Sequence, residues 1–257
     1  MTYVDVHGQR IWHEVSGDGP PVVLLHGAFA GASSFAAQTP ALVAAGFRVY
    51  VPERRGHGHT ADVDGPLSYS VMADDTVAYL EQVLPDGAHL VGWSDGAVVA
   101  LLAAMRRPEL VRRMVLIGQY YNFAGRMPDS DIDELLRSPE AMTFLRTEYD
   151  QVSPDGPEHF PVVYAKTMHM LDTEPQLDLA TFSAVSAPTL VLQGDRDEVT
   201  IEHSVAVVAA LQDARLAVLP GTHLLPVETP DVVNALLASF LRGGPTEPIW
   251  TSSAEGE

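Results

Sequence analysis

The chain has 257 residues, 46% of them hydrophobic, which is enough to bury the core of one α/β domain. A formal net charge of −19 at pH 7 argues against nucleic acid or an anionic membrane surface as a partner, because both would be repelled. The chain has no cysteine, which excludes disulfides, thiolate metal sites and a cysteine nucleophile.

Apolar runs alternate with amphipathic stretches along the chain, and this alternation indicates a mostly parallel sheet covered by helices. The first two strands are separated by a turn at Gly8 and Gln9 and are expected to form an antiparallel hairpin at one edge. Later runs such as 22–25 are apolar at every position, as buried parallel strands are. The predicted strands are 3–7, 10–15, 21–25, 48–52, 89–93, 114–117, 189–193 and 215–219. The predicted helices are 34–45, 69–84, 95–105, 201–211 and 231–241.

The alternation stops after Gly118 and resumes at Ala187. Aromatic residues and acidic helical turns are scattered between these points, and several prolines are expected to break the segment into short helices. We therefore expect a core formed by residues 1–118 and 186–243, with residues 119–185 inserted between two strands as a helical cap.

The two ends of the chain carry little fold information. Residues 244–257 are polar and rich in Gly, Pro and Ser, so we expect them to be disordered. The first residues show neither a basic nor an apolar signal region, and the longest apolar run, 97–105, is far too short to cross a membrane. These features lead us to expect a cytoplasmic protein.

A serine stands between a predicted strand and a predicted helix, in the run Gly92-Trp93-Ser94-Asp95-Gly96. The pattern Gly-x-Ser-x-Gly at such a turn is typical of a nucleophile elbow. The glycines are needed because the strand and the helix pass too close for Cβ atoms, and the serine itself occupies strained backbone. The five-residue pattern also occurs by chance, so the interpretation depends on a base and an acid elsewhere in the chain.

Both partners are present downstream. The predicted strand 189–193 is followed by an acidic loop in which Asp195, Asp197 and Glu198 are candidates, and we predict that Asp197 is the acid. Of the ten histidines, only His223 follows both a strand and this acidic loop, so we predict that it is the base. The order Ser94, acid, histidine is the one expected after a nucleophile elbow.

The oxyanion of a tetrahedral intermediate needs backbone N–H donors. One is predicted to be the N–H of Asp95, at the start of the helix after the serine. The other is expected in the loop after strand 21–25, where Gly27 allows the backbone to approach the site. We predict the N–H of Ala28 as this donor, with Phe29 as the alternative.

The histidines of the run Arg55-Gly56-His57-Gly58-His59 raise the possibility of a metal pair. No carboxylate or third histidine lies nearby at ligand spacing, so we predict that His57 and His59 pack within the loop. The sequence therefore predicts neither a metal site nor an organic cofactor.

In kind and order these motifs resemble those of the α/β-hydrolase superfamily, over residues 1 to about 243. The resemblance implies an eight-stranded, mostly parallel sheet flanked by helices, with an inserted helical cap over the site. It also implies Ser94 as nucleophile, Asp197 as acid and His223 as base. The motifs that carry it are His26-Gly27, Pro52-Glu53-Arg54-Arg55-Gly56-His57-Gly58, Gly92-Trp93-Ser94-Asp95-Gly96, Gly194-Asp195-Arg196-Asp197 and Gly221-Thr222-His223. Two departures are visible: Glu53 stands where family members often have Asp, and Ala97 where a glycine is common.

The elbow Trp93-Ser94-Asp95-Gly96 resembles that of the biphenyl-hydrolase-like, amino-acid-ester hydrolases. This resemblance implies that the Asp95 carboxylate pairs with a free α-amino group of the substrate. The alternative is that Asp95 only complements the positive end of the helix that it begins. We predict that Phe29, Trp93, Asp95 and Leu224 contact the substrate.

The combined prediction is a serine hydrolase that cleaves a small carboxylic ester, or a lactone or amide, through an acyl-enzyme on Ser94. A serine at the elbow argues against the dehalogenases and epoxide hydrolases of this superfamily, which attack with an aspartate. Carbon–carbon bond hydrolases and cofactor-free perhydrolases share the same three residues and stay as alternatives. A low-turnover ligand receptor on the same fold is a further alternative. The expected partner is a small-molecule ester.

Overall fold

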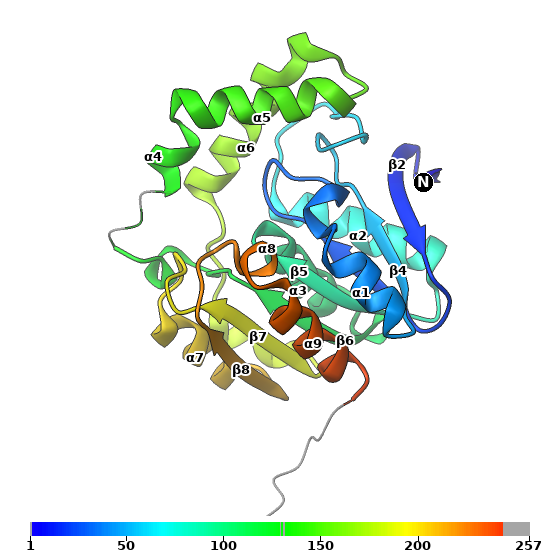
Figure 1. The fold of residues 1–257 in the computed structure, drawn as a ribbon, viewed down its shortest axis with the longest axis vertical. Coiled ribbons are helices and arrows are strands. Elements are labelled where there is room, and N and C mark those ends of the chain that lie inside the picture. Colours follow the sequence, from blue (N-terminus) through cyan, green and yellow to red (C-terminus); the bar gives the residue numbers. More distant parts are fainter. Residues whose placement is uncertain (1, 129, 131, 244–257) are drawn as a thin grey trace, which may run out of the picture.

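The computed structural model describes residues 2–128, 130 and 132–243, so the expected disorder of residues 244–257 lies outside the described residues. At its centre is one eight-stranded sheet with the order β1-β2-β4-β3-β5-β6-β7-β8 (Figure 1). The pairs from β4 to β8 are parallel, whereas β1 pairs with β2 and β2 pairs with β4 in antiparallel fashion. The predicted eight-stranded, mostly parallel sheet is therefore confirmed. The strands are β1 (Thr2–Val6), β2 (Gln9–Ser16), β3 (Pro21–Leu25), β4 (Arg48–Pro52), β5 (Ala88–Trp93), β6 (Val111–Ile117), β7 (Thr189–Gly194) and β8 (Ala214–Leu219).

Successive side chains of a strand point to opposite faces of the sheet. Because the strand residues on both faces are apolar, helices cover both faces. On β3, Val23 and Leu25 belong to one buried cluster, with α2, α3 and α7, whereas Val22 and Leu24 belong to another, with α1 and α9. The α-helices are α1 (Gln38–Ala44), α2 (Tyr69–Val83), α3 (Asp95–Arg106), α4 (Ile132–Leu136), α5 (Pro139–Val152), α6 (Phe160–Thr173), α7 (Ile201–Ala210), α8 (Leu225–Glu228) and α9 (Pro230–Leu241). Short 3₁₀ turns lie at Ala32–Phe35, Pro108–Leu110, Phe123–Gly125, Pro157–His159 and Leu179–Ala184.

Proline positions explain two differences from the predicted helices. The helix expected over 34–45 is a 3₁₀ turn followed by α1, which begins at Gln38 and so keeps Pro40 in its first turn, where a missing N–H is tolerated. The short helices expected between 119 and 185 are wrong for α5 and α6, which have 14 residues each. Pro139 and Pro161 lie in the first turns of these helices and so start them instead of breaking them.

Helices α4, α5 and α6 lie together at one end of the molecule (Figure 1). A buried carboxylate ties α6 to the loop between β4 and α2. Asp62 Oδ2 accepts hydrogen bonds from Lys166 Nζ at 2.6 Å and His159 Nε2 at 2.9 Å. Burial opposes the ionised form of Asp62, but these two hydrogen bonds, a backbone hydrogen bond from Val63 and the charge of Lys166 together lower the Asp62 pKa. None of the helices in the described ranges is both long and apolar enough to cross a membrane.

A substitution at Leu90 tests how much burial at the centre of the sheet contributes to the free energy of unfolding. Its side chain is fully buried on β5, so Leu90→Ala should lower the free energy of unfolding by about 2–5 kcal/mol, through lost burial and a residual cavity. The matched control is Val232→Ala on α9, where the side chain is 54% exposed and a change within about 0.5 kcal/mol is expected. Urea denaturation of both variants measures the difference, and equal losses would contradict this description of the core.

Candidate active site

Ser94 occupies a sharp turn between β5 and α3, with φ 55° and ψ −127°. A Cβ atom on Gly92 would overlap the backbone of Gly96, and one on Gly96 would overlap the backbone of Leu25. The turn is held by Ser94 N–H, which donates to the Ile117 carbonyl at 2.9 Å. The local sequence therefore forms this turn because only glycine fits on either side of the serine.

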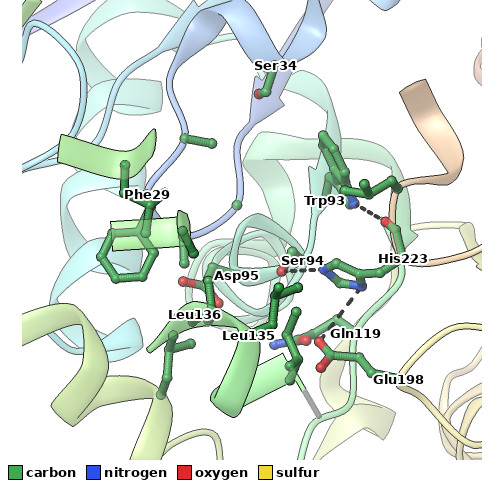
Figure 2. A pocket seen from close by; sticks show the side chains of 18 of the residues that line it. Phe29, Ser34, Trp93, Ser94, Asp95, Gln119, Leu135, Leu136, Glu198 and His223 are labelled. Carbon is green, nitrogen blue, oxygen red and sulfur yellow. Dashed lines mark hydrogen bonds and ion pairs between the residues drawn. The ribbon is translucent and has the colours of Figure 1, made fainter. Parts of the chain in front are cut away.

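His223 lies between Ser94 and Asp197. Figure 2 shows its contact with Ser94. Its Nε2 lies 3.0 Å from Ser94 Oγ, and its Nδ1 lies 2.9 Å from Asp197 Oδ1. The Trp93 indole donates from Nε1 to the His223 carbonyl at 2.9 Å, which fixes the loop that carries the imidazole. The structure thus brings a hydroxyl, an imidazole and a buried carboxylate into one hydrogen-bonded row, although they come from three separate strand ends.

The three acidic candidates after β7 lie in different surroundings. Asp195 Oδ1 accepts a hydrogen bond from Gly221 N–H at 2.9 Å and so holds the loop after β8. Asp197 is at hydrogen-bond distance from His223, and its Oδ1 also accepts from Glu198 N–H at 2.8 Å. The side chain of Glu198 approaches the same ring, with Oε1 3.8 Å from His223 Nδ1.

These carboxylates set the charge preference of His223. Burial of the ring disfavours the charged imidazolium, but the hydrogen bond that His223 donates to Asp197 and the charges of Asp197, Glu198 and Asp95 outweigh it, so the His223 pKa is raised. Burial also raises the pKa of Glu198. The imidazole is therefore a stronger base than an ordinary histidine, as a proton acceptor beside a hydroxyl requires.

Gly118 is a site residue that the sequence analysis did not identify as such. It has φ +59°, and a Cβ there would stand 2.8 Å from Asp197 Oδ2 and 3.3 Å from His223 Nδ1. A side chain at this position would push the acid and the base apart. The signal in the sequence was a glycine directly after a buried strand.

The two predicted oxyanion donors border the same cavity as Ser94. Asp95 is the first residue of α3, where an N–H has no partner within the helix. Gly27 lies so close to Ser94 that a Cβ on it would stand 3.2 Å from Ser94 Cβ, and Ala28 is the next residue of this loop. The alternative donor, Phe29, has φ 56° and also borders the cavity.

The Asp95 side chain is buried beside the serine (Figure 2). Its Oδ1 accepts a hydrogen bond from Tyr69 Oη at 2.6 Å, while its Oδ2 accepts none from the residues that the structure describes. Burial raises the Asp95 pKa, and the positive charge of Arg54 and the Tyr69 hydrogen bond oppose this rise. Asp95 thus borders the cavity and has a buried carboxylate, one oxygen of which lacks a hydrogen-bond partner among the described residues.

The cavity over Ser94 has a volume of about 550 Å³. All four predicted substrate contacts border it: Phe29, Trp93, Asp95 and Leu224. The cavity is also bordered by Gln119 and Glu198, from the loops after β6 and β7, and by Leu135 and Leu136 from α4 (Figure 2). The sequence analysis did not identify these four residues as lining the cavity. A second cavity of about 590 Å³ shares Phe29, Trp93 and Phe144 with the first and extends beneath α5.

His57 and His59 lie in the loop after β4, at the border of the second cavity. His57 Nδ1 donates to the Arg55 carbonyl at 2.9 Å, and burial lowers the His57 pKa to about 4. His59 Nδ1 lies 3.0 Å from Glu53 Oε2, and its ring stacks on Trp12 at 4.3 Å between ring centres. Both rings are therefore bound within the loop structure.

Comparison with known proteins adds a family match. The model of a family described as "Alpha/beta hydrolase family" matches residues 22–236. Pyrrolizixenacetamide deacetylase of Xenorhabdus hominickii is 26% identical, over 94% of this chain and 98% of its own. Pimeloyl-acyl-carrier-protein methyl ester esterase of Nitrosospira multiformis is 28% identical, over 90% of this chain and 98% of its own. Among solved structures, the enol-lactonase from Burkholderia xenovorans LB400 shares the fold, with a TM-score of 0.75 at 22% identity, over 93% of this chain and 99% of that chain.

The His223 environment predicts a direct titration result. In an NMR titration, the imidazole pKa should lie above the ordinary value of 6.5, and Glu198→Gln should lower it, because one of the charges that stabilise the imidazolium is removed. Glu109→Gln is the control, since Glu109 pairs with Arg107 on the surface. An unchanged or higher His223 pKa in Glu198→Gln would show that Glu198 does not act on the ring.

Proposed function

The chain belongs to the α/β hydrolase family, and from that premise we propose that it is a serine hydrolase that cleaves a small carboxylic ester, lactone or amide. The observation that carries this proposal is the hydrogen-bonded row from Ser94 Oγ through His223 to Asp197, with distances of 3.0 and 2.9 Å. A hydroxyl is a weak nucleophile until an adjacent base takes its proton, and this row supplies such a base.

The names of two relatives support the choice of bond. The relative from Xenorhabdus hominickii is called a deacetylase, and that from Nitrosospira multiformis a methyl ester esterase. Both names describe removal of an acyl or alkyl group by cleavage at a carbonyl carbon. The same type of bond fits a serine nucleophile in a cavity of about 550 Å³.

In the proposed first half-reaction, Ser94 Oγ attacks the substrate carbonyl while His223 Nε2 accepts its proton. Asp197 keeps the Nδ1 proton in place and stabilises the imidazolium that forms. The N–H groups of Ala28 and Asp95 donate to the oxyanion of the tetrahedral intermediate. Collapse of this intermediate breaks the bond to the leaving alcohol, and His223 donates the proton to the departing oxygen.

In the second half-reaction, water replaces the alcohol. His223 accepts a proton from the water as its oxygen attacks the acyl-enzyme carbonyl, and the same two N–H groups hold the new oxyanion. Release of the carboxylic acid restores the Ser94 hydroxyl. The cycle consumes one water and needs no redox partner.

We further propose that residues 119–185 act as a cap on a core formed by residues 1–118 and 186–243. Helices α4 and α5 contribute Leu135, Leu136 and Phe144 to the cavity over Ser94. These side chains are apolar, so they favour the apolar part of a small substrate. The shape of the cap then sets which acyl or alcohol groups fit.

A chromogenic ester panel tests the proposed reaction. The wild type should turn over short and medium acyl esters many times, and a fluorophosphonate should label Ser94 in a one-to-one ratio. Ser94→Ala should abolish both, and Asp197→Asn should lower kcat by about 10⁴-fold because the imidazole loses its orienting partner. Asp195→Asn is the matched control and should retain kcat, since Asp195 holds a loop through Gly221. Turnover equal to the Ser94→Ala background on every ester would contradict the proposal.

We also propose that Asp95 favours substrates with a free α-amino group. Asp95 borders the cavity, and its buried Oδ2 accepts no hydrogen bond from the described residues, although a buried carboxylate oxygen gains free energy from a donor. An ammonium group next to the scissile carbonyl supplies both a donor and a compensating charge. A position at the start of α3 accounts for a negative charge there but not for a carboxylate oxygen without a hydrogen-bond partner.

Matched esters test this specificity. The ratio of kcat/KM for a valine ester over the isovalerate ester of the same alcohol should exceed one and fall about 10- to 100-fold in Asp95→Asn, because a charge-assisted hydrogen bond is lost. The backbone N–H of residue 95 is retained in this variant, so the isovalerate ester acts as the internal control. A ratio that Asp95→Asn leaves unchanged would assign Asp95 to the helix end alone.

A further inference from the structure

Arg54 is a buried cation directly behind the loop that carries Ala28. Only 5% of the residue is exposed, and its Nη2 lies 2.5 Å from the His26 carbonyl oxygen and 2.9 Å from the Gly27 carbonyl oxygen. Its Nε and Nη1 have no acceptor within the described part of the chain. A buried charge with unpaired donors costs free energy. The contacts that the Arg54 guanidinium does make should therefore have a function that offsets this cost.

The Gly27 carbonyl has a second donor, which comes from His26. The His26 Nε2 accepts a hydrogen bond from Arg54 N–H at 3.1 Å, so the ring proton sits on Nδ1, which lies 2.8 Å from the Gly27 carbonyl oxygen. Burial and the charge of Arg54 lower the His26 pKa well below its usual range, which keeps the ring in this neutral form. The Gly27 carbonyl therefore accepts hydrogen bonds from the His26 ring and the Arg54 guanidinium. The His26 ring is itself held by the backbone N–H of Arg54.

The direction of the next N–H follows from peptide geometry. The carbonyl of Gly27 and the N–H of Ala28 belong to one planar trans peptide, so they point in opposite directions. The carbonyl points toward Arg54 and His26, and the N–H must therefore point away from them. On that side lies the cavity that Ala28 and Ser94 both border.

Resting on the proposed function, we infer that Arg54 is a positioning residue for the oxyanion hole. By binding the Gly27 carbonyl, it fixes the peptide plane that aims the Ala28 N–H at the developing oxyanion. A donor that is fixed before the reaction needs no reorganisation when charge develops, and this is why such donors are effective. Arg54 touches no reacting atom itself.

The charge of Arg54 acts in the same direction. The Asp95 carboxylate adjoins the serine, and a negative charge there opposes formation of a second negative charge on the oxyanion. Arg54 interacts with Asp95 electrostatically and offsets this charge. Arg54 thus combines a hydrogen-bonding role on the loop with an electrostatic role on the site.

The test compares Arg54→Lys and Arg54→Gln with the neighbouring Arg55→Gln. Arg55 binds Asp75 on α2 through two hydrogen bonds of 2.6 Å. We expect both Arg54 variants to lower kcat by about 10- to 100-fold, with KM within about threefold of the wild type. The inhibition constant of a trifluoromethyl ketone, whose serine adduct carries the oxyanion, should rise by the same factor as kcat/KM falls. Arg55→Gln should leave kcat and this inhibition constant unchanged.

Three results would overturn the inference: kcat retained in both Arg54 variants, a loss expressed in KM alone, or an unchanged inhibition constant for the ketone. Ester affinity in a Ser94→Ala background, by calorimetry, should be the same with and without Arg54→Lys. A fall in that affinity equal to the loss of kcat/KM would assign Arg54 to ground-state binding and also contradict the inference.

Two NMR readouts keep the test independent of turnover and of variant folding. If the wild type hydrolyses no ester, the proposed function fails, and the inference then requires the Gly27 carbonyl carbon resonance to move upfield in Arg54→Lys but not in Arg55→Gln. If neither Arg54 variant folds, the test uses the wild type with and without the trifluoromethyl ketone. Formation of the adduct must shift the Ala28 amide proton resonance downfield, and an unchanged chemical shift overturns the inference.

Discussion

The chemistry of this fold depends on how closely three backbone segments approach one another at Ser94. Strand β5, helix α3 and the loop after β3 meet there, and glycines at positions 27, 92 and 96 remove the Cβ atoms that would keep them apart. The same contact holds Ser94 at φ 55°, a conformation that a serine adopts only when its surroundings impose it. Steric exclusion thus presents the hydroxyl to His223.

Buried polar side chains help to fix the loops around this turn. Two of them belong to consecutive residues after β4. Glu53 accepts hydrogen bonds from Ala32 N–H at 2.9 Å and from the backbone and ring of His59, and Arg54 binds the carbonyls before Ala28. A buried polar group costs free energy when it has no hydrogen-bond partner, and its hydrogen bonds are directional. Each loop is therefore favoured in the one position that satisfies these hydrogen bonds. Glu53 and Arg54 thus hold two loops near Ser94 through directional contacts.

The sequence predicted most of the sheet because its signals are local. Buried strands read as apolar runs. Each site residue follows a strand, so the parallel strand ends bring Ser94, Asp197 and His223 together, as the distances show. Errors arose where one residue changes a local preference, as Pro40 does in α1. Arg54 and the approach of Glu198 to His223 were missed for another reason: their partners lie 25 to 28 residues away, and no local pattern marks these contacts.

The contact between α6 and Asp62 gives the chain a built-in chemical reporter. Lys166 is the only lysine in the sequence, and its ammonium is held by Asp62 and by the Val63 carbonyl at 2.7 Å. Reagents that acylate amines need access to the nitrogen, and both contacts occupy it while α6 stays against the loop. The rate at which this one side chain is acylated therefore reports how often the contact between α6 and the loop opens, without any label being introduced.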